Sequence, residues 1–384
     1  MAGLDTSSDL TFMRRALELA ARGRGAVEPN PMVGCVIVRN GRIIGEGFHE
    51  RFGGPHAEPN ALASCTESTA GATAYVTLEP CCHTNKKTPP CVPQLVGAKV
   101  ARVVVGCADP NPQVAGGGID QLRSAGIEVT CGVLEAECRQ LNAPFFALVR
   151  EKRPYVTLKW AQSNDGTMAG PPGQRLWISN GTSQKTVHRF RSLCDAILVG
   201  INTVLCDDPL LTVRGVEPKR TLARAVLNRD LTIPSSSRLV QSAKTTPVLV
   251  YCSTDAGAQK PQAVQELNQL GVEVISLPYD QPRGISLTAV LRDLGSRRFT
   301  HLLVEPGPTL ARGFLSQNLA DRVWIYRSPR DFGEHGSPKA PDVTYPAAAQ
   351  IDLDGDQLTE YLNPASPCFF CLRGSPELDQ LRVQ

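Results

Sequence analysis

The strongest constraint on this chain is a set of side chains that can reach one metal ion although they lie well apart in the sequence. His56 is followed by Glu58 in GGPHAEPN, and Cys81 and Cys91 follow in TLEPCCHTNKKTPPC. A catalytic zinc site uses three protein ligands and leaves the fourth position to water, whereas a structural site closes all four. We therefore expect a fold that brings His56, Cys81 and Cys91 to one ion. Glu58 then stands beside the ion as the proton acceptor that a metal-activated water needs.

Two further residues, Cys82 and His83, are rival ligands. Adjacent side chains rarely point at the same ion, so we interpret Cys82 as a bystander thiol, and the same argument demotes His83. The alternative to a catalytic site is a structural zinc knot with Glu58 as an ordinary surface acid. The constellation has no Cys-x-x-Cys knuckle, which counts against that alternative. Histidine, glutamate and a Pro-Cys pair occur together in zinc-dependent nucleobase deaminases, in which the glutamate shuttles protons and is not a ligand.

Length and pattern indicate two α/β domains. A chain of 384 residues is long enough to form two separate cores. β-rich runs alternate with helical segments up to about residue 150, where charge and proline in VREKRPYVTL interrupt the pattern. We place the domains at 1–150 and 151–384, and we expect irregular structure in the Pro- and Ser-rich C-terminal stretch. Strands are expected in VGCVIV and RIIGEGFH, joined by an Asn-Gly turn, then in ATAYVTL, ARVVVGCA, YVTLKWA, AILVG, RAVLN, PVLVYC, VEVISL, HLLVE and RVWIY.

Charge and composition favour a small-molecule partner over nucleic acid or a membrane. The 40 Lys and Arg nearly balance the 37 Asp and Glu, and no apolar run is long enough to span a bilayer. The N-terminal stretch has the spacing of an amphipathic helix, with Leu10, Met13, Ala16, Leu17 and Ala20 on one face. The whole chain has thirteen cysteines, which are scattered and are not accompanied by a secretory signal. This pattern is typical of reduced thiols. We expect a cytoplasmic protein, and a homo-oligomer.

Four stretches in the first half carry a specific resemblance: PNPMVGCVIV, GFHERFGGPHAE, GATAYVTLEPCCHTNKKTPPC and DPNPQVAGGG. Together they resemble the deaminase half of the bifunctional riboflavin-biosynthesis deaminase/reductase family. Cytidine and transfer-RNA deaminases share the HAE and Pro-Cys elements, but their second cysteine follows the first after two residues. The long loop that ends in TPPC distinguishes the riboflavin type.

The resemblance implies roles for named residues of this half. His56, Cys81 and Cys91 would bind Zn²⁺, and Glu58 would be the proton shuttle. Asn30, His49 and Lys87 match substrate-contacting positions, and Asp109 and Asn111 match a segment near the same pocket. Ordinary turn chemistry is the alternative for Asn30 in Pro-Asn-Pro, and also for Asp109 and Asn111.

The second half resembles the reductase half of the same family, through LKWAQSNDGTMA, LWISN, HRFRSLCDAILVGINTVLCDDPLLTVR and VEPGPTLARGFL. No G-x-G-x-x-G follows a strand here, so a dihydrofolate-reductase-like fold and NADPH are implied by the resemblance alone. The implied catalytic residues are Lys159 and Asp207. The implied cofactor contacts are Gln162, Trp177, Thr203, Asp207 and Gly307, and the implied substrate contacts are Arg175, Arg191, Leu211, Arg214 and Glu305.

The arginines suit a ribose phosphate, which requires fixed cationic donors. Alternatives stay open for two of the reductase residues. Arg191 could be a solvent-facing helix charge. Asp207 and Asp208 both precede Pro209, so one of them could cap a turn.

The chain departs from the family pattern in three places. The loop between Cys81 and Cys91 is one residue longer, through NKK, which bears on the role of Lys87. LNRD stands where an LD-Ser-like segment is usual, so a cofactor contact there is lost or is replaced by Arg229. Arg175 occupies a position that often holds a small polar residue.

The resemblance implies two successive reactions. They are zinc-dependent hydrolytic deamination of 2,5-diamino-6-ribosylamino-4(3H)-pyrimidinone 5′-phosphate and NADPH-dependent reduction of its ribosyl group to a ribityl chain. The alternatives are a nucleobase or nucleic-acid deaminase with an unrelated or degenerate C-terminal domain, and a zinc-stabilised binding module without catalysis.

Overall fold

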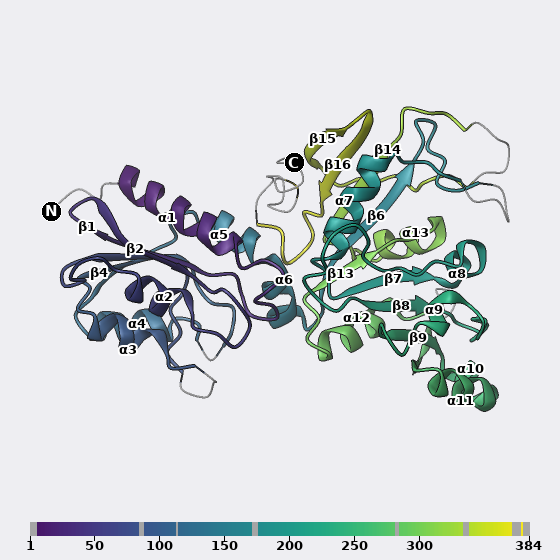
Figure 1. The fold of residues 1–384 in the computed structure, drawn as a ribbon, viewed down its shortest axis with the longest axis horizontal. Coiled ribbons are helices and arrows are strands. Elements are labelled where there is room, and N and C mark those ends of the chain that lie inside the picture. Colours follow the sequence, from purple (N-terminus) through teal and green to yellow (C-terminus); the bar gives the residue numbers. More distant parts are fainter. Residues whose placement is uncertain are drawn as a thin grey trace. The chain divides into compact units, whose positions relative to one another are not determined.

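A computed structural model shows two compact units, Met1–Glu151 and Lys152–Gln384 (Figure 1). The structure describes residues 6–83, 88–112, 114–170, 176–280, 284–332, 338–370 and 378. Two predicted substrate contacts, Lys87 and Arg175, lie outside the described residues. Both units alternate strands with helices.

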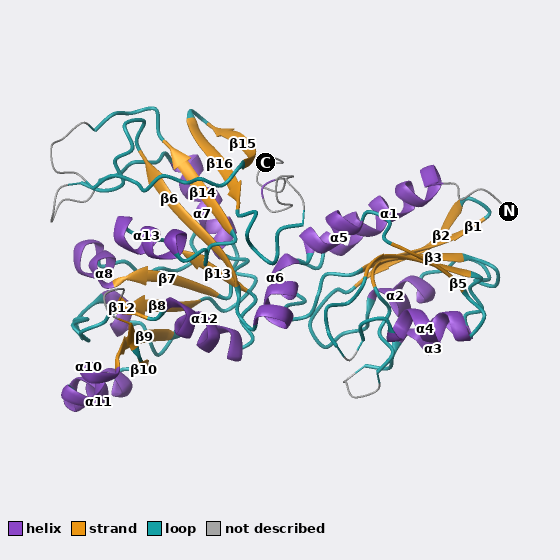
Figure 2. Ribbon diagram, turned by 180° about the vertical axis from the view of Figure 1, so that it is seen from behind, coloured by secondary structure: helices purple, strands orange, loops and turns teal. Residues whose placement is uncertain are grey.

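The first unit is a five-stranded mixed sheet with helices on both faces (Figures 1 and 2). The strand order is β2-β1-β3-β4-β5; β1 is antiparallel to β2 and β3, and β3, β4 and β5 are parallel. Helices α1 and α5 cover one face, and α2, α3 and α4 cover the other. The elements are α1 (Thr6–Ala21), β1 (Gly34–Arg39), β2 (Arg42–Phe48), α2 (Ala57–Ala63), β3 (Thr73–Leu78), α3 (Cys91–Gly97), β4 (Arg102–Cys107), α4 (Gly117–Ser124), β5 (Glu128–Cys131), α5 (Glu135–Leu141), α6 (Ala143–Phe146) and the π-helical turn η1 (Ala147–Glu151).

The predicted hairpin and the predicted N-terminal helix are both confirmed. Asn40 and Gly41, which join β1 to β2, both have positive φ (53° and 72°), as a tight hairpin turn requires. Helix α1 buries the apolar face that its spacing predicted. It packs closely on β1 because Gly34 has no side chain; a Cβ there would lie 2.0 Å from the carbonyl oxygen of Ala16.

A buried carboxylate ties α1 to the middle of this sheet. Asp9 of α1 is 5% exposed and accepts two hydrogen bonds from the Arg102 guanidinium on β4, at 2.9 and 2.8 Å. The hydroxyl of Tyr75 on β3 donates a third, at 2.8 Å. Burial disfavours the charged carboxylate, but the Arg102 and Tyr75 hydrogen bonds outweigh it and lower the pKa of Asp9 below its ordinary value of 3.8.

The second unit is built on a nine-stranded sheet of order β10-β9-β8-β7-β13-β6-β14-β16-β15. Along this order, neighbouring strands are parallel for β10, β9, β8, β7, β13, β6 and β14. The pairs β14–β16 and β16–β15, which complete one edge, are antiparallel. The larger strands are β6 (Tyr155–Gln162), β7 (Ala196–Gly200), β8 (Ala223–Leu227), β9 (Val248–Ser253), β10 (Val272–Leu277), β13 (His301–Val304), β14 (Arg322–Arg327), β15 (Ala347–Leu353) and β16 (Asp356–Leu362); β11 (Tyr279–Asp280) and β12 (Gly284–Ile285) form a separate short pair. The helices are α7 (Gly181–Arg191), α8 (Ile201–Asp207), α9 (Arg238–Gln241), α10 (Thr254–Gln259), α11 (Pro261–Gln269), α12 (Leu287–Ser296) and α13 (Pro308–Ser316).

Alternating residues of the central strands bury into two different cores, one on each face of this sheet. In β7, Ile197 and Val199 join a core with residues of α7, α8, α9 and α11, whereas Ala196 and Leu198 join a core with α12 and α13. Such strands are apolar on both faces, which is why their sequences are nearly continuous hydrophobic runs. All strands that the sequence predicted in this half are present.

The prediction of an irregular C-terminal stretch was wrong for residues 347–362. They form the hairpin β15–β16, which pairs with β14 and so extends the main sheet. Ile351, Leu353 and Leu358 alternate with exposed residues, and Asp354 and Gly355 turn with positive φ. The Asp-Gly pair in the sequence is typical of a hairpin turn, but the prolines around it favoured the prediction of irregular structure. None of the helices in the described segments combines the length and apolarity needed to cross a bilayer.

The Asp9 contacts predict a pH-dependent stability of the first unit. Because the folded pKa of Asp9 is lowered, its ionised form stabilises the fold above the unfolded pKa, and this contribution disappears as the pH falls through the folded pKa. Asp9→Asn should lower the free energy of unfolding by about 1.5–3 kcal/mol at pH 7. The difference between wild type and variant should shrink below about pH 4.

Urea unfolding at a series of pH values measures this difference, with the exposed Glu67→Gln as the control for loss of one negative charge. An Asp9→Asn effect that is equally large at pH 3 and pH 7 would show that the carboxylate charge is not what Asp9 contributes.

Candidate active sites

Three predicted metal ligands converge in the first unit. The Nδ1 atom of His56 lies 3.5 Å from Sγ of Cys81 and 3.4 Å from Sγ of Cys91, and the two sulfur atoms are 3.4 Å apart. Bonds of about 2.3 Å to sulfur and about 2.0 Å to nitrogen in a tetrahedral zinc site separate the donor atoms by about 3.5–3.8 Å. The donor set and its spacing therefore fit a zinc ion. It is the single cluster of three such donors within the described part of the chain.

Each ligand is placed by the end of a regular element. His56 immediately precedes α2, Cys91 is the first residue of α3, and Cys81 follows β3. The backbone amides of Cys91 and Val92 donate to the carbonyl oxygen of Cys81, at 3.0 and 3.3 Å. These two bonds fix the start of α3 against the end of β3, so the two sulfurs meet although a long loop separates them.

The His56 ring is held from outside the cluster as well. Its Nε2 atom lies 3.2 Å from Oγ1 of Thr88. With Nδ1 facing the sulfurs as the ligand atom, Nε2 carries the proton and donates to the Thr88 hydroxyl. Such an outer contact fixes the tautomer and the orientation of a metal-binding histidine. Sequence reasoning missed Thr88, although it stands in the TPPC segment that distinguishes this loop.

Glu58 lies beside the three ligands and has an environment suited to proton transfer. It is in the first turn of α2 and only 3% exposed. Burial, together with the neighbouring Cys81 thiolate, raises the pKa of Glu58 above its ordinary value. The hydrogen bond with Cys81 and burial likewise raise the pKa of the Cys91 thiol. A divalent cation is the partner that would offset this concentration of negative charge.

The rival ligands take no part in the cluster. Cys82 packs, partly buried, against the apolar core between the sheet and helices α2 to α4. Neither Cys82 nor His83 offers a donor atom to the group formed by His56, Cys81 and Cys91.

Two predicted substrate contacts of this unit, Asn30 and His49, touch each other next to the metal ligands. His49 Nδ1 is 2.8 Å from the carbonyl oxygen of Pro55, to which it donates, so Nε2 accepts from the Asn30 amide at 3.2 Å. The His49 and His56 rings meet edge to face, with centroids 5.4 Å apart. Burial is the main cause that lowers the pKa of His49, which favours the neutral ring. Asn30 thus has a specific partner and is more than a turn residue.

Four of the predicted reductase residues, Lys159, Arg191, Arg214 and Glu305, gather around one histidine in the second unit. Arg191, at the end of α7, donates to both carboxylate oxygens of Glu305, at 2.9 and 2.8 Å. Burial opposes the charge of Glu305, but Arg191 and Lys159 outweigh it and lower the pKa of this carboxyl to about 2. Burial lowers the pKa of Lys159 on β6, whose Nζ atom lies 5.2 Å from the centre of the Tyr326 ring. Arg191 is therefore a buried, paired residue and is not a solvent-facing helix charge.

The histidine at the centre of these charges, His188, was missed by sequence reasoning. It lies one turn before Arg191 on α7, and its Nδ1 atom accepts a hydrogen bond from the backbone amide of Arg214 at 3.3 Å. Burial and the charges of Arg191 and Arg214 lower the pKa of His188 to about 4. His188 is therefore neutral at pH 7, with its remaining proton on Nε2. Leu211, another predicted contact, is buried and has a positive φ of 52°.

The residues predicted to contact the cofactor lie at or beyond the carboxyl ends of adjacent strands of the same sheet. Thr203 and the exposed Asp207 are in α8, which follows β7, and Gly307 precedes α13, which follows β13. A Cβ on Gly307 would meet no protein atom within 4 Å, so the fold leaves open space at this helix start. Gln162 ends β6 and accepts from the indole of Trp160 at 2.8 Å.

Trp177 is the most exposed large apolar side chain among the described residues, at 57%. Its carbonyl oxygen accepts a hydrogen bond from the Arg330 guanidinium, at 3.0 Å. The indole is thus presented on the surface by a backbone segment that is held in place.

Two ambiguities in the sequence are resolved by the structure. Asp208 ends α8 in the left-handed conformation and accepts from the backbone amide of Arg238, which leaves Asp207 exposed. Asn228, where the chain departs from the family pattern, is 1% exposed and binds the amides of Thr232 and Ile233 within its own loop. Its neighbour Arg229 forms an exposed ion pair with Asp230.

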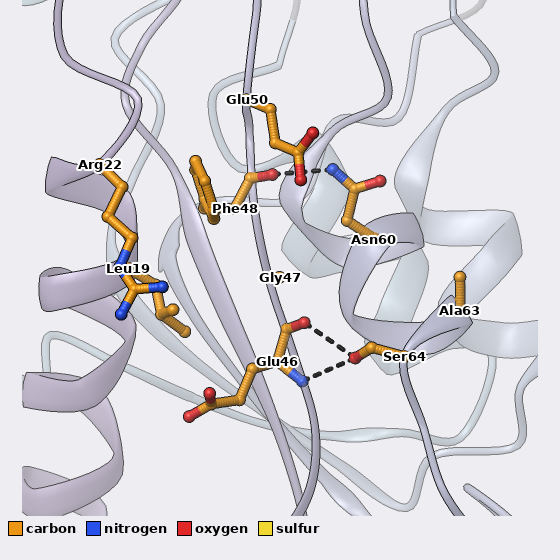
Figure 3. Close-up of a pocket in the computed structure, with 9 residues that line it drawn as sticks. All are labelled: Leu19, Arg22, Glu46, Gly47, Phe48, Glu50, Asn60, Ala63 and Ser64. Atoms are coloured by element: carbon orange, nitrogen blue, oxygen red, sulfur yellow. Dashed lines mark hydrogen bonds between the residues drawn. The ribbon is translucent and has the colours of Figure 1, made fainter.

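A surface pocket on the first unit lies along the edge strand β2 (Figure 3). None of the predicted site residues lines it; its walls are Leu19, Arg22, Glu46, Gly47, Phe48, Glu50, Asn60, Ala63 and Ser64. Two side chains bind free backbone groups of the strand. Ser64, the C-cap of α2, accepts through Oγ from the amide of Glu46, and Asn60 of α2 donates to the carbonyl oxygen of Phe48, both at 2.8 Å. These capped groups cannot pair with another strand.

Comparisons with known proteins match both units. Residues 6–107 match the family described as the cytidine and deoxycytidylate deaminase zinc-binding region, and residues 154–354 match the RibD C-terminal domain. The riboflavin biosynthesis protein RibD of Aquifex aeolicus is 40% identical, over 85% of this chain and 88% of that protein. The solved structure of Acinetobacter baumannii RibD, form 1, has a TM-score of 0.80 and 36% identity, covering 93% of this chain and 99% of its own.

A second solved structure, a diaminohydroxyphosphoribosylaminopyrimidine deaminase/5-amino-6-(5-phosphoribosylamino)uracil reductase from Thermotoga maritima, has a TM-score of 0.78 and 36% identity, covering 94% and 99%. These findings confirm the predicted fold class of both halves and the predicted cofactors, zinc for the deaminase domain and NADPH for the reductase domain.

The Thr88 contact predicts a measurable effect on zinc affinity. Thr88→Val keeps the shape of the side chain but removes the hydroxyl that accepts from His56, so zinc should bind about 10–100-fold more weakly. Competition with a chromophoric chelator measures this affinity. Cys82→Ser is the matched control next to the cluster and should leave both affinity and zinc content unchanged. Loss of zinc from Cys82→Ser together with retention in Cys91→Ser would contradict the ligand set.

Proposed function

The chain belongs to the RibD family of riboflavin biosynthesis proteins, and we propose that it performs two successive reactions on one pyrimidine ribosylamino-phosphate. The first is hydrolytic deamination of 2,5-diamino-6-ribosylamino-4(3H)-pyrimidinone 5′-phosphate. The second is NADPH-dependent reduction of the ribosyl group to a ribityl chain. The observation that carries the proposal is the cluster of His56, Cys81 and Cys91 with the buried Glu58 beside it. The deaminase is assigned to residues 1–150 and the reductase to residues 151–384.

In the deaminase domain, His56, Cys81 and Cys91 would hold the zinc ion, which activates a water molecule for attack. Glu58 accepts the proton that this water releases and delivers it to the exocyclic amine. The ring carbon gains an oxygen, its bond to the amine breaks, and ammonia leaves. Exclusion of water around Glu58 suits a group that must take up and release one proton in each turnover.

Asn30 and His49 are proposed to position the pyrimidine beside the ion. His49 donates its Nδ1 proton to the carbonyl oxygen of Pro55, and its Nε2 atom accepts a hydrogen bond from the Asn30 side-chain amide. These two bonds hold the His49 and Asn30 side chains in one orientation. Lys87, Asp109 and Asn111 complete the proposed pocket by resemblance. Asp109 and Asn111 do form a turn, in which the backbone amide of Asn111 donates to the Asp109 carboxylate at 2.8 Å. This turn is compatible with a role in binding the substrate.

In the reductase domain, NADPH would supply the hydride, and Gln162, Trp177, Thr203, Asp207 and Gly307 are proposed to line its site. The hydride adds to the anomeric carbon as the bond from this carbon to the ring oxygen breaks, and that oxygen must then gain a proton. Lys159 suits this step, because burial lowers its pKa and a less stable ammonium gives up a proton more easily.

The remaining charged groups of the cluster are proposed to hold the substrate. Glu305 is kept ionised and rigid by Arg191, and Arg214 supplies further positive charge for the phosphate. Arg175, which lies outside the described residues, is proposed as a further substrate contact by resemblance alone. Leu211 would border the pyrimidine. Arg229 is proposed as a residue facing the cofactor phosphates, in place of the usual segment at LNRD.

Two of the earlier alternatives lose their basis, and the third, a degenerate C-terminal domain, is tested by NADPH oxidation. A deaminase with an unrelated C-terminal domain is contradicted by the match of residues 154–354 to the RibD C-terminal domain. A binding module without catalysis does not explain two enzyme domains in one chain. A small-molecule substrate fits the family, and a homo-oligomer, a cytoplasmic location and the absence of nucleic-acid and membrane partners remain predictions.

The two activities should be separable by single substitutions. Glu58→Gln keeps the size of the side chain but cannot accept a proton, so it should abolish ammonia release, while NADPH oxidation on the deaminated intermediate continues. Lys159→Ala and Asp207→Asn should do the reverse, with NADPH oxidation falling about 100-fold or more.

Ammonia and NADPH are followed separately on both substrates for each variant, with zinc content measured in parallel. Glu67→Gln and Lys185→Ala, both exposed, are the matched controls. Loss of both activities in a folded, zinc-loaded Glu58→Gln protein would mean that the two reactions share one site. Wild-type protein that deaminates but never oxidises NADPH would show a degenerate reductase.

NADPH binding should quench tryptophan fluorescence mainly through Trp177. Trp177 is 57% exposed, whereas Trp160 and Trp324 are 3% and 0% exposed and have indole hydrogen bonds inside the fold. Titration of wild type and Trp177→Phe with NADPH compares the two contributions. A quench of the same size in Trp177→Phe would remove Trp177 from the cofactor site.

A further inference from the structure

Glu79 is a buried acid next to the zinc centre with no role in the chemistry described above. It follows β3 directly and is two residues before Cys81. The residue is 3% exposed, and its backbone amide donates to the carbonyl oxygen of Cys107 at the end of β4, at 2.9 Å. The side chain therefore starts from the point where two parallel strands end and their loops begin.

The Glu79 carboxylate is surrounded by backbone amides. Oε2 accepts from the amides of Asp109 and Gly116, at 3.3 and 3.1 Å. Oε1 accepts from the amides of Gly118 and Ile119, at 3.0 and 3.3 Å. One acid thus binds Asp109, in the loop after β4, and Gly116, Gly118 and Ile119 at the start of α4. Buried carboxylates are costly unless they are hydrogen-bonded in this way.

The glycines of this segment are explained by the same contact. Gly116 has a φ of 81°, in the left-handed region that glycine adopts without strain. A Cβ on Gly118 would lie 2.1 Å from the carbonyl oxygen of Pro80 and 3.2 Å from Oε1 of Glu79. Only glycine lets the backbone come this close to the residue before Cys81. A Cβ on Gly117 would lie 3.2 Å from Sγ of Cys82, so Gly117 and Gly118 both lie beside the chain that leads from β3 to Cys81.

We propose that Glu79 is a positioning residue of the deaminase: its carboxylate fixes segment 109–119 against the strand end that carries Cys81. This inference rests on the proposed function, because segment 109–119 contains Asp109 and Asn111, the proposed substrate contacts. Through Glu79, the groups that bind the pyrimidine and a ligand of the ion keep one geometry. A misplacement of about 1 Å between binding groups and reacting centre can lower kcat/KM by as much as about 100-fold.

The test compares deamination by wild type and Glu79→Gln with the diaminopyrimidinone phosphate as substrate. Glutamine has the same shape, but its NH₂ group faces backbone donors and cannot accept from them. KM for deamination should rise about 10-fold or more, with a smaller change in kcat. Zinc content and NADPH oxidation on the deaminated intermediate should stay at wild-type values. Gly118→Ala attacks the same contact from the other side and should change KM in the same direction.

The matched controls are Glu67→Gln, an exposed acid, and Gly97→Ala, an exposed glycine whose Cβ would meet no atom within 4 Å. Lower thermal stability of Glu79→Gln with an unchanged KM would assign Glu79 a purely structural role and overturn the proposal. Wild-type protein without any deamination would instead defeat the proposed function.

If Glu79→Gln does not fold, hydrogen exchange on wild-type protein decides. The amides of Gly116, Gly118 and Ile119 should be protected. Exchange at the rate of an unfolded peptide would also overturn the proposal.

Discussion

The structure of the first unit depends on keeping two thiols and a carboxylate together in a place that excludes water. The sulfurs of Cys81 and Cys91 are 3.4 Å apart, and Glu58 beside them is 3% exposed. Like charges this close raise one another's pKa, and a cation between the donors would stabilise their ionised forms. The end of β3 and the starts of α2 and α3 hold these groups together. The bonds from α3 to the Cys81 carbonyl show how the backbone supports that geometry.

The second unit also buries a carboxylate, but here cationic side chains of the protein stabilise its charge. Lys159, Arg191 and Glu305 come from β6, α7 and the end of β13, and they lie on the same face of the sheet as the core that contains Phe190 and Trp324. Here the cations are built into the protein, so Glu305 stays ionised without a metal. Burial, together with the charges of Arg191 and Arg214, lowers the pKa of His188 to about 4 and keeps this ring neutral. The cluster therefore offers fixed positive charge to an anion and one neutral hydrogen-bond donor, which suits a phosphorylated sugar better than an uncharged one.

Sequence reasoning was most successful where the signal is local. Most strands of both sheets, the Asn40-Gly41 turn and the amphipathic N-terminal helix follow from periodicity and turn chemistry over a few residues. The short edge strand β5 was not predicted. The convergence of His56, Cys81 and Cys91 was predictable because few other arrangements of these residue types are chemically sensible. The hairpin β15–β16 was missed because its short alternating pattern stands among prolines, and its pairing partner β14 is distant in sequence.

The roles of residues that act on other site residues could not be predicted from the sequence, for a different physical reason. Thr88, His188 and Glu79 have no motif of their own, and what they do depends on which backbone or ring atom the fold places opposite them. The glycines at 116–118 predict that the backbone comes close to another group. The sequence does not show which group this is. The run of glycines therefore predicts a close backbone approach, and the fold shows that at 116–118 this approach brings backbone amides to the buried carboxylate of Glu79.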